Sequence, residues 1–306
     1  MSSTVGENAA PGHALTSRPG VLLAELSLVA MAIIWGVNYS VVKYGTTLVA
    51  PLAYNGVRVA IAAALLCLIV AAGRMPLPPR RTIASLLGLG VLGNGIYQFL
   101  FIEGIARTRA SDAALIAAAT PAFVALIGHT RGVERITRRG LAGIALSFAG
   151  MSLVVLGAAR ASDGRSSLVG GMLVLAGTLA WAIFTVLLKP RAEGLPGFQV
   201  SAFTMAGGAL LLLVVGAPSI VAADWASIPA IGWAALGYST VFALVIAYYF
   251  WYRGVRVLGP TRTALFSNLQ PVIAMFMAWL ILHEMPTPWQ VAGAGSIMTG
   301  LLLTRA

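Results

Sequence analysis

The sequence predicts an all-α integral membrane protein of ten transmembrane helices, arranged as two inverted five-helix repeats. Three observations carry this prediction: the composition, the spacing of the apolar runs and an internal repeat. Of the 306 residues, 59% are apolar and 9% are charged, whereas a soluble globular domain has about 25% charged residues. Such a chain is built to lie in hydrocarbon rather than in water.

The apolar runs have the length that a bilayer requires. A transmembrane helix needs about 20 mainly apolar residues, and runs of this kind, bounded by Pro, Gly or charge, predict spans at residues 21–45, 51–73, 82–104, 110–131, 139–159, 167–189, 197–217, 228–252, 260–282 and 287–304. No room remains for a soluble domain. Residues 1–20 are polar and lack the apolar core of a signal peptide, so we expect them to form a disordered cytoplasmic tail.

The basic residues predict the orientation. The formal net charge is +11, and Lys and Arg gather in cytoplasmic loops of membrane proteins. With the N-terminus inside, five of them fall outside, namely Lys43, Arg107, Arg109, Arg160 and Arg165, and fourteen fall inside: Arg18, Arg74, Arg80, Arg81, Arg131, Arg135, Arg138, Arg139, Lys189, Arg191, Arg253, Arg256, Arg262 and Arg305. Both termini are therefore expected to be cytoplasmic. The basic residues are scattered over every inner loop, which argues against nucleic-acid binding.

An internal repeat divides the chain into two halves. An offset of 146 residues matches Trp35 with Trp181, and an offset of 150 matches Gly104 with Gly254, Ala114 with Ala264, Leu115 with Leu265, Pro121 with Pro271, Glu134 with Glu284, Gly143 with Gly293 and Gly150 with Gly300. Coincidence in an apolar chain of low complexity is the alternative. Because each half holds an odd number of spans, residues 161–306 should lie inverted relative to residues 21–160, a pattern typical of transporters.

A family resemblance rests on a few residues in each half: Trp35 with Lys43, Arg58, the run Ala113–Pro121 with Glu134 after it, and their counterparts Trp181, Lys189, Pro271 and Glu284. With these residues the chain resembles the drug/metabolite transporter superfamily with two EamA-type repeats, over nearly all of residues 21–304. The resemblance implies a bacterial inner-membrane exporter of small metabolites. The aromatic-rich spans look most like amino-acid exporters of the YddG type.

Two prolines predict helix breaks near the bilayer midplane. Pro121 and Pro271 lie about eleven residues into their spans and remove a backbone donor each, which would leave the carbonyls of Ala117 and Ser267 free. Such breaks should face protein or a water-filled cavity, and symmetric breaks indicate a binding site. The plainer alternative is that both prolines only curve their helices.

Polar and aromatic residues at matching depth are candidates for binding the substrate. We expect the site to include Trp35, Asn38, Tyr39, Arg58, Tyr97, Gln98, Thr120, Trp181, Tyr248, Ser267, Asn268 and Gln270. Some of the amides and hydroxyls could instead join neighbouring helices, a common packing device in membranes. Trp35 and Trp181 offer flat faces to an aromatic or aliphatic substrate. Trp251 and Tyr252, beside Arg253, fit an interfacial anchor.

Arg58 is the basic residue placed well within a span, where a charge needs a partner or water. It could bind a substrate carboxylate or form an ion pair with Glu103 or Asp112, or its side chain could reach the nearby interface. The nine acidic residues fall in the tail, in loops or at span ends, so no midplane proton relay is evident. The scattered acids also argue against an enzyme and against a metal site, and no cofactor is expected.

The sequence thus predicts a secondary transporter that exports small metabolites, foremost aromatic or other neutral amino acids, by alternating access. The alternative is a carrier of the same superfamily for phosphorylated sugars, nucleotide sugars or drugs. The substrate, proton coupling, net direction and oligomeric state are not specified by the residues.

Overall fold

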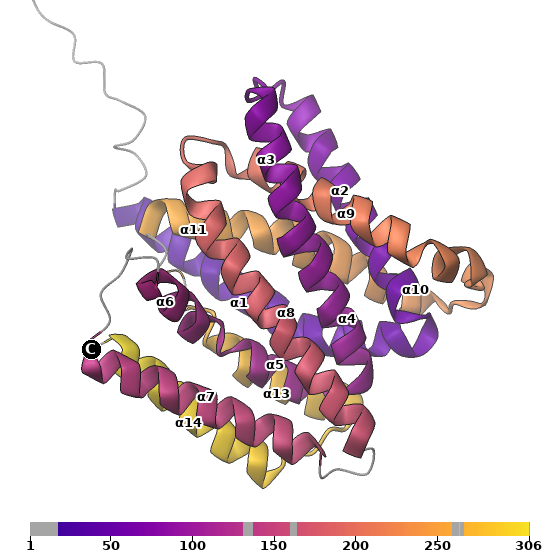
Figure 1. The fold of residues 1–306 in the computed structure, drawn as a ribbon. Helices are drawn as coiled ribbons and strands as arrows, with labels where there is room; N and C mark the ends of the chain where they lie inside the picture. Colours follow the sequence, from indigo (N-terminus) through magenta and orange to yellow (C-terminus); the bar gives the residue numbers. More distant parts are fainter. Residues whose placement is uncertain (1–17, 131–136, 160–163, 259–262, 264–265, 306) are drawn as a thin grey trace, which may run out of the picture.

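The fold is a bundle of helices, shown in Figure 1, and the described part of the chain contains no strand. The computed structural model describes residues 18–130, 137–159, 164–258, 263 and 266–305. Within these residues, eight helices are long and apolar enough to cross a membrane: Gly20–Leu48, Pro51–Ala72, Arg80–Arg107, Ala110–Thr130, Arg138–Gly157, Ser167–Leu188, Gly197–Ala222 and Ala230–Gly254. Leu269–Leu282 is a shorter apolar helix. The predicted all-α class is confirmed.

Several of these spans are composed of more than one helical element. In chain order the elements are α1 (Arg18–Leu48), α2 (Pro51–Ala72), α3 (Arg80–Gly90), η2 (Val91–Ile96), α4 (Tyr97–Arg107), α5 (Ala110–Ala117), α6 (Thr120–Thr130), α7 (Arg138–Ala159), α8 (Gly164–Ala192), α9 (Gly197–Ala222), η3 (Trp225–Ser227), α10 (Ala230–Gly237), η4 (Tyr238–Ile246), α11 (Ala247–Leu258), α13 (Leu269–Leu282) and α14 (Pro288–Arg305). Glu134 and the side chain of Lys189 lie outside the described part.

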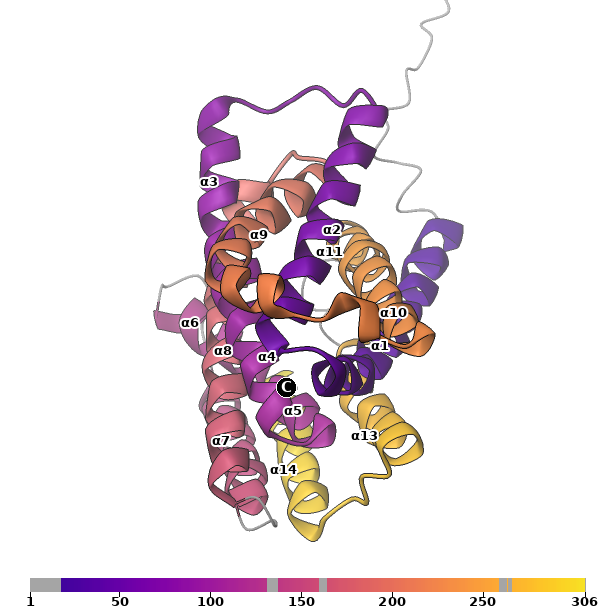
Figure 2. The same ribbon diagram turned by 90° about the vertical axis from the view of Figure 1, so that its right-hand side faces the viewer.

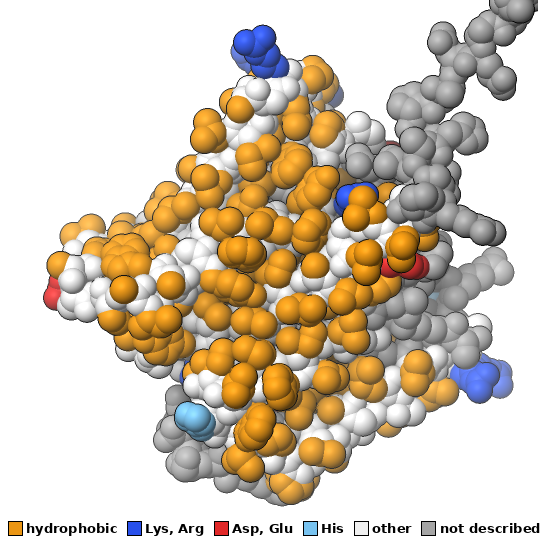
Figure 3. Space-filling view, turned by 180° about the vertical axis from the view of Figure 1, so that it is seen from behind, with side chains coloured by type: hydrophobic (Ala, Val, Ile, Leu, Met, Phe, Trp, Pro, Cys, Tyr) orange, Lys and Arg blue, Asp and Glu red, His pale blue; other side chains and the backbone are white. Residues whose placement is uncertain are grey.

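Many large hydrophobic side chains are exposed on the described part of the bundle. Figure 3 shows one face covered with hydrophobic side chains, with Lys, Arg, Asp and Glu near its edges. Large aliphatic side chains stand exposed on this bundle, Val221 at 85% and Val214 at 75% among them. A water-soluble monomer rarely exposes a contiguous apolar surface of this extent, so the helices are suited to contact lipid tails.

Helices from the first half of the sequence pack against helices from the second half. α7 packs along α14, α2 along α9, α4 along α8, and α1 against both α11 and α13. Figures 1 and 2 both show α7 and α14 side by side at one edge of the molecule. Helices that are far apart in the sequence therefore enclose the interior together.

Close contact between α3 and α9 depends on glycine. A Cβ atom added at Gly90 would meet the backbone of Thr204, and one at Gly207 would meet the backbone of Leu87. Gly88, on the same helix as Gly90, has nothing within 4 Å of the same construction. Glycines at two facing positions thus bring these helices together, as small residues do at membrane helix interfaces.

Two spans contain a π-helical segment that the sequence did not reveal. η2 lies between α3 and α4, and η4 lies between α10 and α11. The Tyr248 hydroxyl, just after η4, donates a hydrogen bond of 3.2 Å to Oδ1 of Asn94 in η2. π-Helical turns occur often at functional sites, and here this bond joins the first turn of α11, which follows η4, to η2.

Candidate functional site

A cavity of about 310 Å³ lies inside the bundle. It is lined by residues of α1, α2, α4, α5, α6, α8, η4, α11 and α13. The structure brings together around it every residue that the sequence singled out for the site: Trp35, Asn38, Tyr39, Arg58, Tyr97, Gln98, Thr120, Pro121, Trp181, Tyr248, Ser267, Asn268, Gln270 and Pro271. Its volume falls within the range of small-molecule sites, about 300–1,000 Å³.

Both prolines stand directly after an interruption of their helix. α5 ends at Ala117 and α6 begins at Thr120, while α13 begins after the turn at Ser267 and Asn268. The predicted free carbonyls are not free. Ala117 O accepts the Thr120 hydroxyl at 2.7 Å, and Ser267 O accepts the backbone N–H of Gln270 at 3.1 Å. Local donors replace the bonds that proline cannot make, so neither carbonyl is left without a hydrogen-bond donor.

Seven aromatic side chains along the cavity wall form one continuous series of ring contacts, which we call the aromatic chain. Its members, in order of contact, are Trp251, Trp35, Tyr248, Trp181, Tyr97, Phe101 and Tyr39. Neighbouring ring centroids are between 5.1 Å and 5.9 Å apart. One end is Trp251 of α11 and the other is Tyr39 of α1, the helix that also carries Trp35. The chain gives the cavity an extended apolar wall contributed by α1, α4, α8 and α11.

Sequence reasoning assigned one member of this wall wrongly. Trp251 was expected to be an interfacial anchor, but it lines the cavity and its ring centroid lies 5.8 Å from that of Trp35. Tyr252, the next residue, packs against buried residues of α8 and α9. The α-helical spacing of Trp251 from Tyr248 was the available signal, since residues three apart share a face.

Other lining residues were missed although the same spacing marks them. Phe101 follows Tyr97 by four positions, and Thr178 and Thr185 flank Trp181 by three and four. Each therefore lies on the helix face that carries a residue already chosen. Helical periodicity around a chosen residue would have found all of them.

Arg58 is fully buried beside the cavity, at 1% exposure. Its Nη2 donates to Oδ1 of Asn55 at 2.7 Å and to Oε1 of Gln98 at 2.8 Å. Within the described structure, its Nε and Nη1 have no hydrogen-bond partner. The guanidinium is thus held in place by neutral amides, with the N–H donors of Nε and Nη1 left unpaired.

This arrangement corrects two expectations about Arg58. A side chain at 1% exposure does not reach the interface. The two acids expected as partners are engaged elsewhere, because Glu103 pairs with Arg107 and Asp112 accepts a hydrogen bond from Gln290. Among the described residues that line the cavity, none is Asp or Glu, and Arg58 alone is basic. The described cavity wall therefore holds one cation and no carboxylate.

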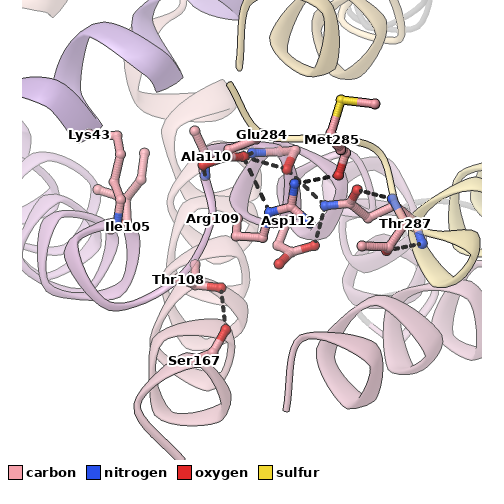
Figure 4. A network of polar contacts seen from close by, with 12 residues as sticks. Lys43, Ile105, Thr108, Arg109, Ala110, Asp112, Ser167, Glu284, Met285 and Thr287 are labelled. Carbon is pink, nitrogen blue, oxygen red and sulfur yellow. Dashed lines mark hydrogen bonds and ion pairs between the residues drawn. The ribbon is translucent and has the colours of Figure 1, made fainter. Parts of the chain in front are cut away.

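A polar network joins the start of α5 to the connection between α13 and α14. The Glu284 carboxylate accepts hydrogen bonds from the backbone N–H groups of Ala110 at 3.0 Å and Ser111 at 3.2 Å. Arg109 lies 3.7 Å from Glu284 and donates to the carbonyl of Met285 at 2.5 Å (Figure 4). An acidic side chain at a helix N-terminus satisfies orphan donors and complements the helix dipole, so Glu284 caps α5 from the distant half of the chain.

Two further polar residues lie at this end. Gln290 donates to the Ser111 hydroxyl at 2.8 Å and to Oδ1 of Asp112 at 2.7 Å. Lys43, at the end of α1, donates to the carbonyls of Ile105 and Ala106 at 3.0 Å and 2.9 Å. Within the described residues, no group of three or more His, Cys, Asp or Glu could hold a metal ion.

Known proteins resemble this chain over nearly its whole length. The chain is 26% identical to the uncharacterized transporter YyaM of Bacillus subtilis, over 90% of this chain and 92% of that protein. It is 29% identical to a probable amino-acid metabolite efflux pump of Salmonella typhimurium, over 89% of this chain and 91% of that protein. A solved crystal structure has the same fold, with a TM-score of 0.64 at 18% identity, and covers 94% of this chain and 99% of that one.

A family model provides the assignment. The model described as the EamA-like transporter family matches residues 22–156 and again residues 168–306. These two matches cover most of the chain, and the relatives are named as transporters. Together with the apolar spans, they identify an integral membrane transporter. The chain belongs to the EamA-like transporter family, within the drug/metabolite transporter superfamily.

Proposed function

We propose that this protein exports amino acids, foremost aromatic or other neutral ones, across the bacterial inner membrane by alternating access. The observation that carries the proposal is Arg58, whose Nε and Nη1 are unpaired beside a cavity without a described acidic residue. A buried charge without a counter-charge is costly. A substrate carboxylate would supply both the missing charge and the missing hydrogen-bond acceptors, in the geometry that guanidinium groups prefer.

The aromatic chain supports the proposal that the substrate is an aromatic or other neutral amino acid. Its ring faces offer an apolar surface of the kind that holds aromatic or aliphatic side chains. The polar edges of two members are already used, because Nε1 of Trp35 donates to Ala243 O at 2.9 Å and the Tyr248 hydroxyl donates to Asn94. An amino acid would place its carboxylate at Arg58 and its side chain against these faces. The name of the Salmonella relative agrees with this substrate class.

We further propose ten spans in two inverted halves, residues 21–160 and 161–306. Several observations support two related halves. The family model matches once in each half. Each half also has one π-helical segment and one helix break, before Pro121 and before Pro271. The packing agrees, since α1 contacts α11 and its counterpart α8 contacts α4. Two halves of opposite orientation can exchange conformations around one central site, which is the basis of alternating access. The basic residues favour cytoplasmic termini.

The alternative is a carrier of another solute, such as phosphorylated sugars, nucleotide sugars or drugs. A phosphate dianion would favour several basic side chains, and the cavity presents Arg58 alone among its described lining residues. A cationic drug would favour a lining carboxylate, and none is present in that set. The charge of the cavity therefore favours a monocarboxylate over both alternatives.

Counterflow in proteoliposomes tests the proposal. Purified protein is reconstituted with an internal panel of unlabelled amino acids, and the uptake of labelled phenylalanine and leucine is followed with and without an imposed pH gradient. We expect exchange with aromatic or aliphatic amino acids. Exchange that ignores the gradient would identify a facilitator, and exchange driven by it would identify proton coupling. No exchange with any amino acid would overturn the proposal and direct the search to phosphorylated and nucleotide sugars.

A further inference from the structure

Several polar groups on the cavity wall already have hydrogen-bond partners within the protein. The hydroxyls of Thr120, Thr178 and Thr185 donate to carbonyls of their own or the adjoining helix at 2.7–2.8 Å. Oε1 of Gln98 accepts from Arg58. Because a hydroxyl or amide that already has a partner gains little from a ligand, these groups contribute little to substrate recognition.

One acceptor on the wall is left over. Asn38 lines the cavity and is 9% exposed, and its Oδ1 is buried without a hydrogen-bond donor in the described structure. Buried carbonyl oxygens almost always have a partner, and an unsatisfied one calls for an explanation. Among the fully buried side-chain polar atoms of the described lining residues, the unpaired ones are therefore Nε and Nη1 of Arg58 and this one oxygen.

These leftovers match the two charged groups of an α-amino acid. We propose that Asn38 accepts a hydrogen bond from the substrate's α-ammonium group, while Arg58 binds the carboxylate. The cavity then selects α-amino acids over simple carboxylic acids and over simple amines. This inference rests on the proposed function, because it assigns a second contact within the same site.

The surroundings of Asn38 suit an ammonium group. Asn38 follows Trp35 by three positions on α1 and so shares a helix face with it, and Tyr39, the next residue, lines the same cavity. Aromatic ring faces attract cations. The terminal amide of asparagine rotates over a broad range, which allows its oxygen to turn toward a ligand in the cavity.

A neutral acceptor is also the right choice beside Arg58. A carboxylate on the cavity wall would attract the guanidinium and compete with the substrate for its unpaired N–H groups. An amide oxygen accepts from the ammonium group and leaves Arg58 free. The absence of Asp and Glu from the described lining residues is what this division of labour requires.

The test compares three compounds that share a phenyl side chain. Phenylalanine carries both charged groups, 3-phenylpropionate lacks the amine, and phenethylamine lacks the carboxylate. Each competes against labelled phenylalanine in proteoliposome counterflow with the wild type, Asn38→Leu, Asn38→Asp and Arg58→Gln. Asn38→Leu keeps the size of the side chain and removes the acceptor.

We expect the wild type to prefer phenylalanine over either analogue by about 10- to 100-fold, the value of one hydrogen bond to a charged group. Asn38→Leu should lower the apparent affinity for phenylalanine by a similar factor and leave the apparent affinity for 3-phenylpropionate unchanged. Arg58→Gln should weaken both of these compounds. Asn38→Asp, which keeps an acceptor but adds a charge, should improve phenethylamine relative to 3-phenylpropionate.

The failures are distinguishable. If Asn38→Leu weakens phenylalanine and 3-phenylpropionate equally, or weakens neither, the role of Asn38 is overturned while the amino-acid proposal stands. The same holds if the wild type does not distinguish these two compounds. If the protein exchanges no amino acid, the proposed function fails and this inference fails with it.

Discussion

The Glu284 carboxylate accepts a hydrogen bond of 2.6 Å from the Ser111 hydroxyl. Together with the backbone contacts to Ala110 and Ser111, this bond ties the connection before α14 to the first turn of α5. Ser111 and Glu284 are 173 positions apart in the sequence. The bond between them therefore holds two distant segments of the chain together.

Removing the Glu284 carboxylate should loosen this end of the bundle. Glu284→Ala leaves the α5 donors without their cap, and the loss of such bonds costs about 1–3 kcal/mol. We expect a lower melting temperature in detergent. In a Cys67→Ser background we also expect a cysteine placed at the fully buried Ala113 to become reactive toward a maleimide. Unchanged stability and unchanged labelling would show that the network is not a tie between the halves.

Arg58 should matter for transport and not for stability. Arg58→Gln removes a buried charge, and replacing such a charge by a neutral group is often neutral or stabilising, whereas losing one partner of a buried ionic contact costs a ligand about 30-fold or more in affinity. We expect exchange to fall by that factor at an equal or higher melting temperature. Arg58→Lys keeps the charge without the forked geometry and should retain partial exchange. Full activity of Arg58→Gln would contradict a carboxylate at this position.

The two symmetric tryptophans of the aromatic chain should support transport. Trp35→Ala or Trp181→Ala removes a large apolar face from the cavity, so we expect impaired exchange with normal amounts of folded protein in the membrane. Trp279→Ala is the matched control, because Trp279 on α13 is 45% exposed and does not line the cavity. Normal flux in both cavity variants would contradict the assignment of these rings to the substrate.

A pair of glycine variants tests the packing of α3 on α9. Gly90→Ala places a methyl group against the backbone of Thr204, and overpacking of this kind costs about 1–3 kcal/mol. Gly88→Ala meets nothing within 4 Å and should be neutral or slightly stabilising, because alanine favours a helix by about 1 kcal/mol over glycine. Melting curves of the two purified variants decide the matter. Equal stability would mean that α9 does not depend on close approach at Gly90.

Much of the fold could be predicted because lipid imposes a simple rule. Long apolar runs such as Pro51–Ala72 must be helical, since helices satisfy their own backbone groups in hydrocarbon. The segments η2 and η4 escaped prediction because a π-helical turn needs no distinctive residue at its place. The α-helical periodicity of the apolar residues is the same before and after the turn. The turn changes only how the face of one flanking helix lines up with the face of the other.

The partners of Arg58 show the same limit at the site. Asn55 stands three positions before Arg58 on α2, so helical spacing could have named it. Gln98 comes from α4, 40 positions away, and no pattern in a single sequence links the two. Trp251 was misplaced because its neighbour Arg253 suggested an interface, whereas the face it occupies is set by how α11 packs on α1. Tertiary packing, and not local sequence, determines such contacts.

The aromatic chain gives the protein a built-in optical reporter. The protein has seven tryptophans, and three of them, Trp35, Trp181 and Trp251, lie on the cavity wall. The ring of Tyr248 contacts the rings of Trp35 and Trp181. Excitation energy absorbed by Tyr248 will transfer to the indoles of Trp35 and Trp181. The fluorescence of an indole depends on the groups that contact it. Occupancy of the cavity should therefore change the intrinsic fluorescence of the unlabelled protein, so that binding can be followed separately from movement across the membrane.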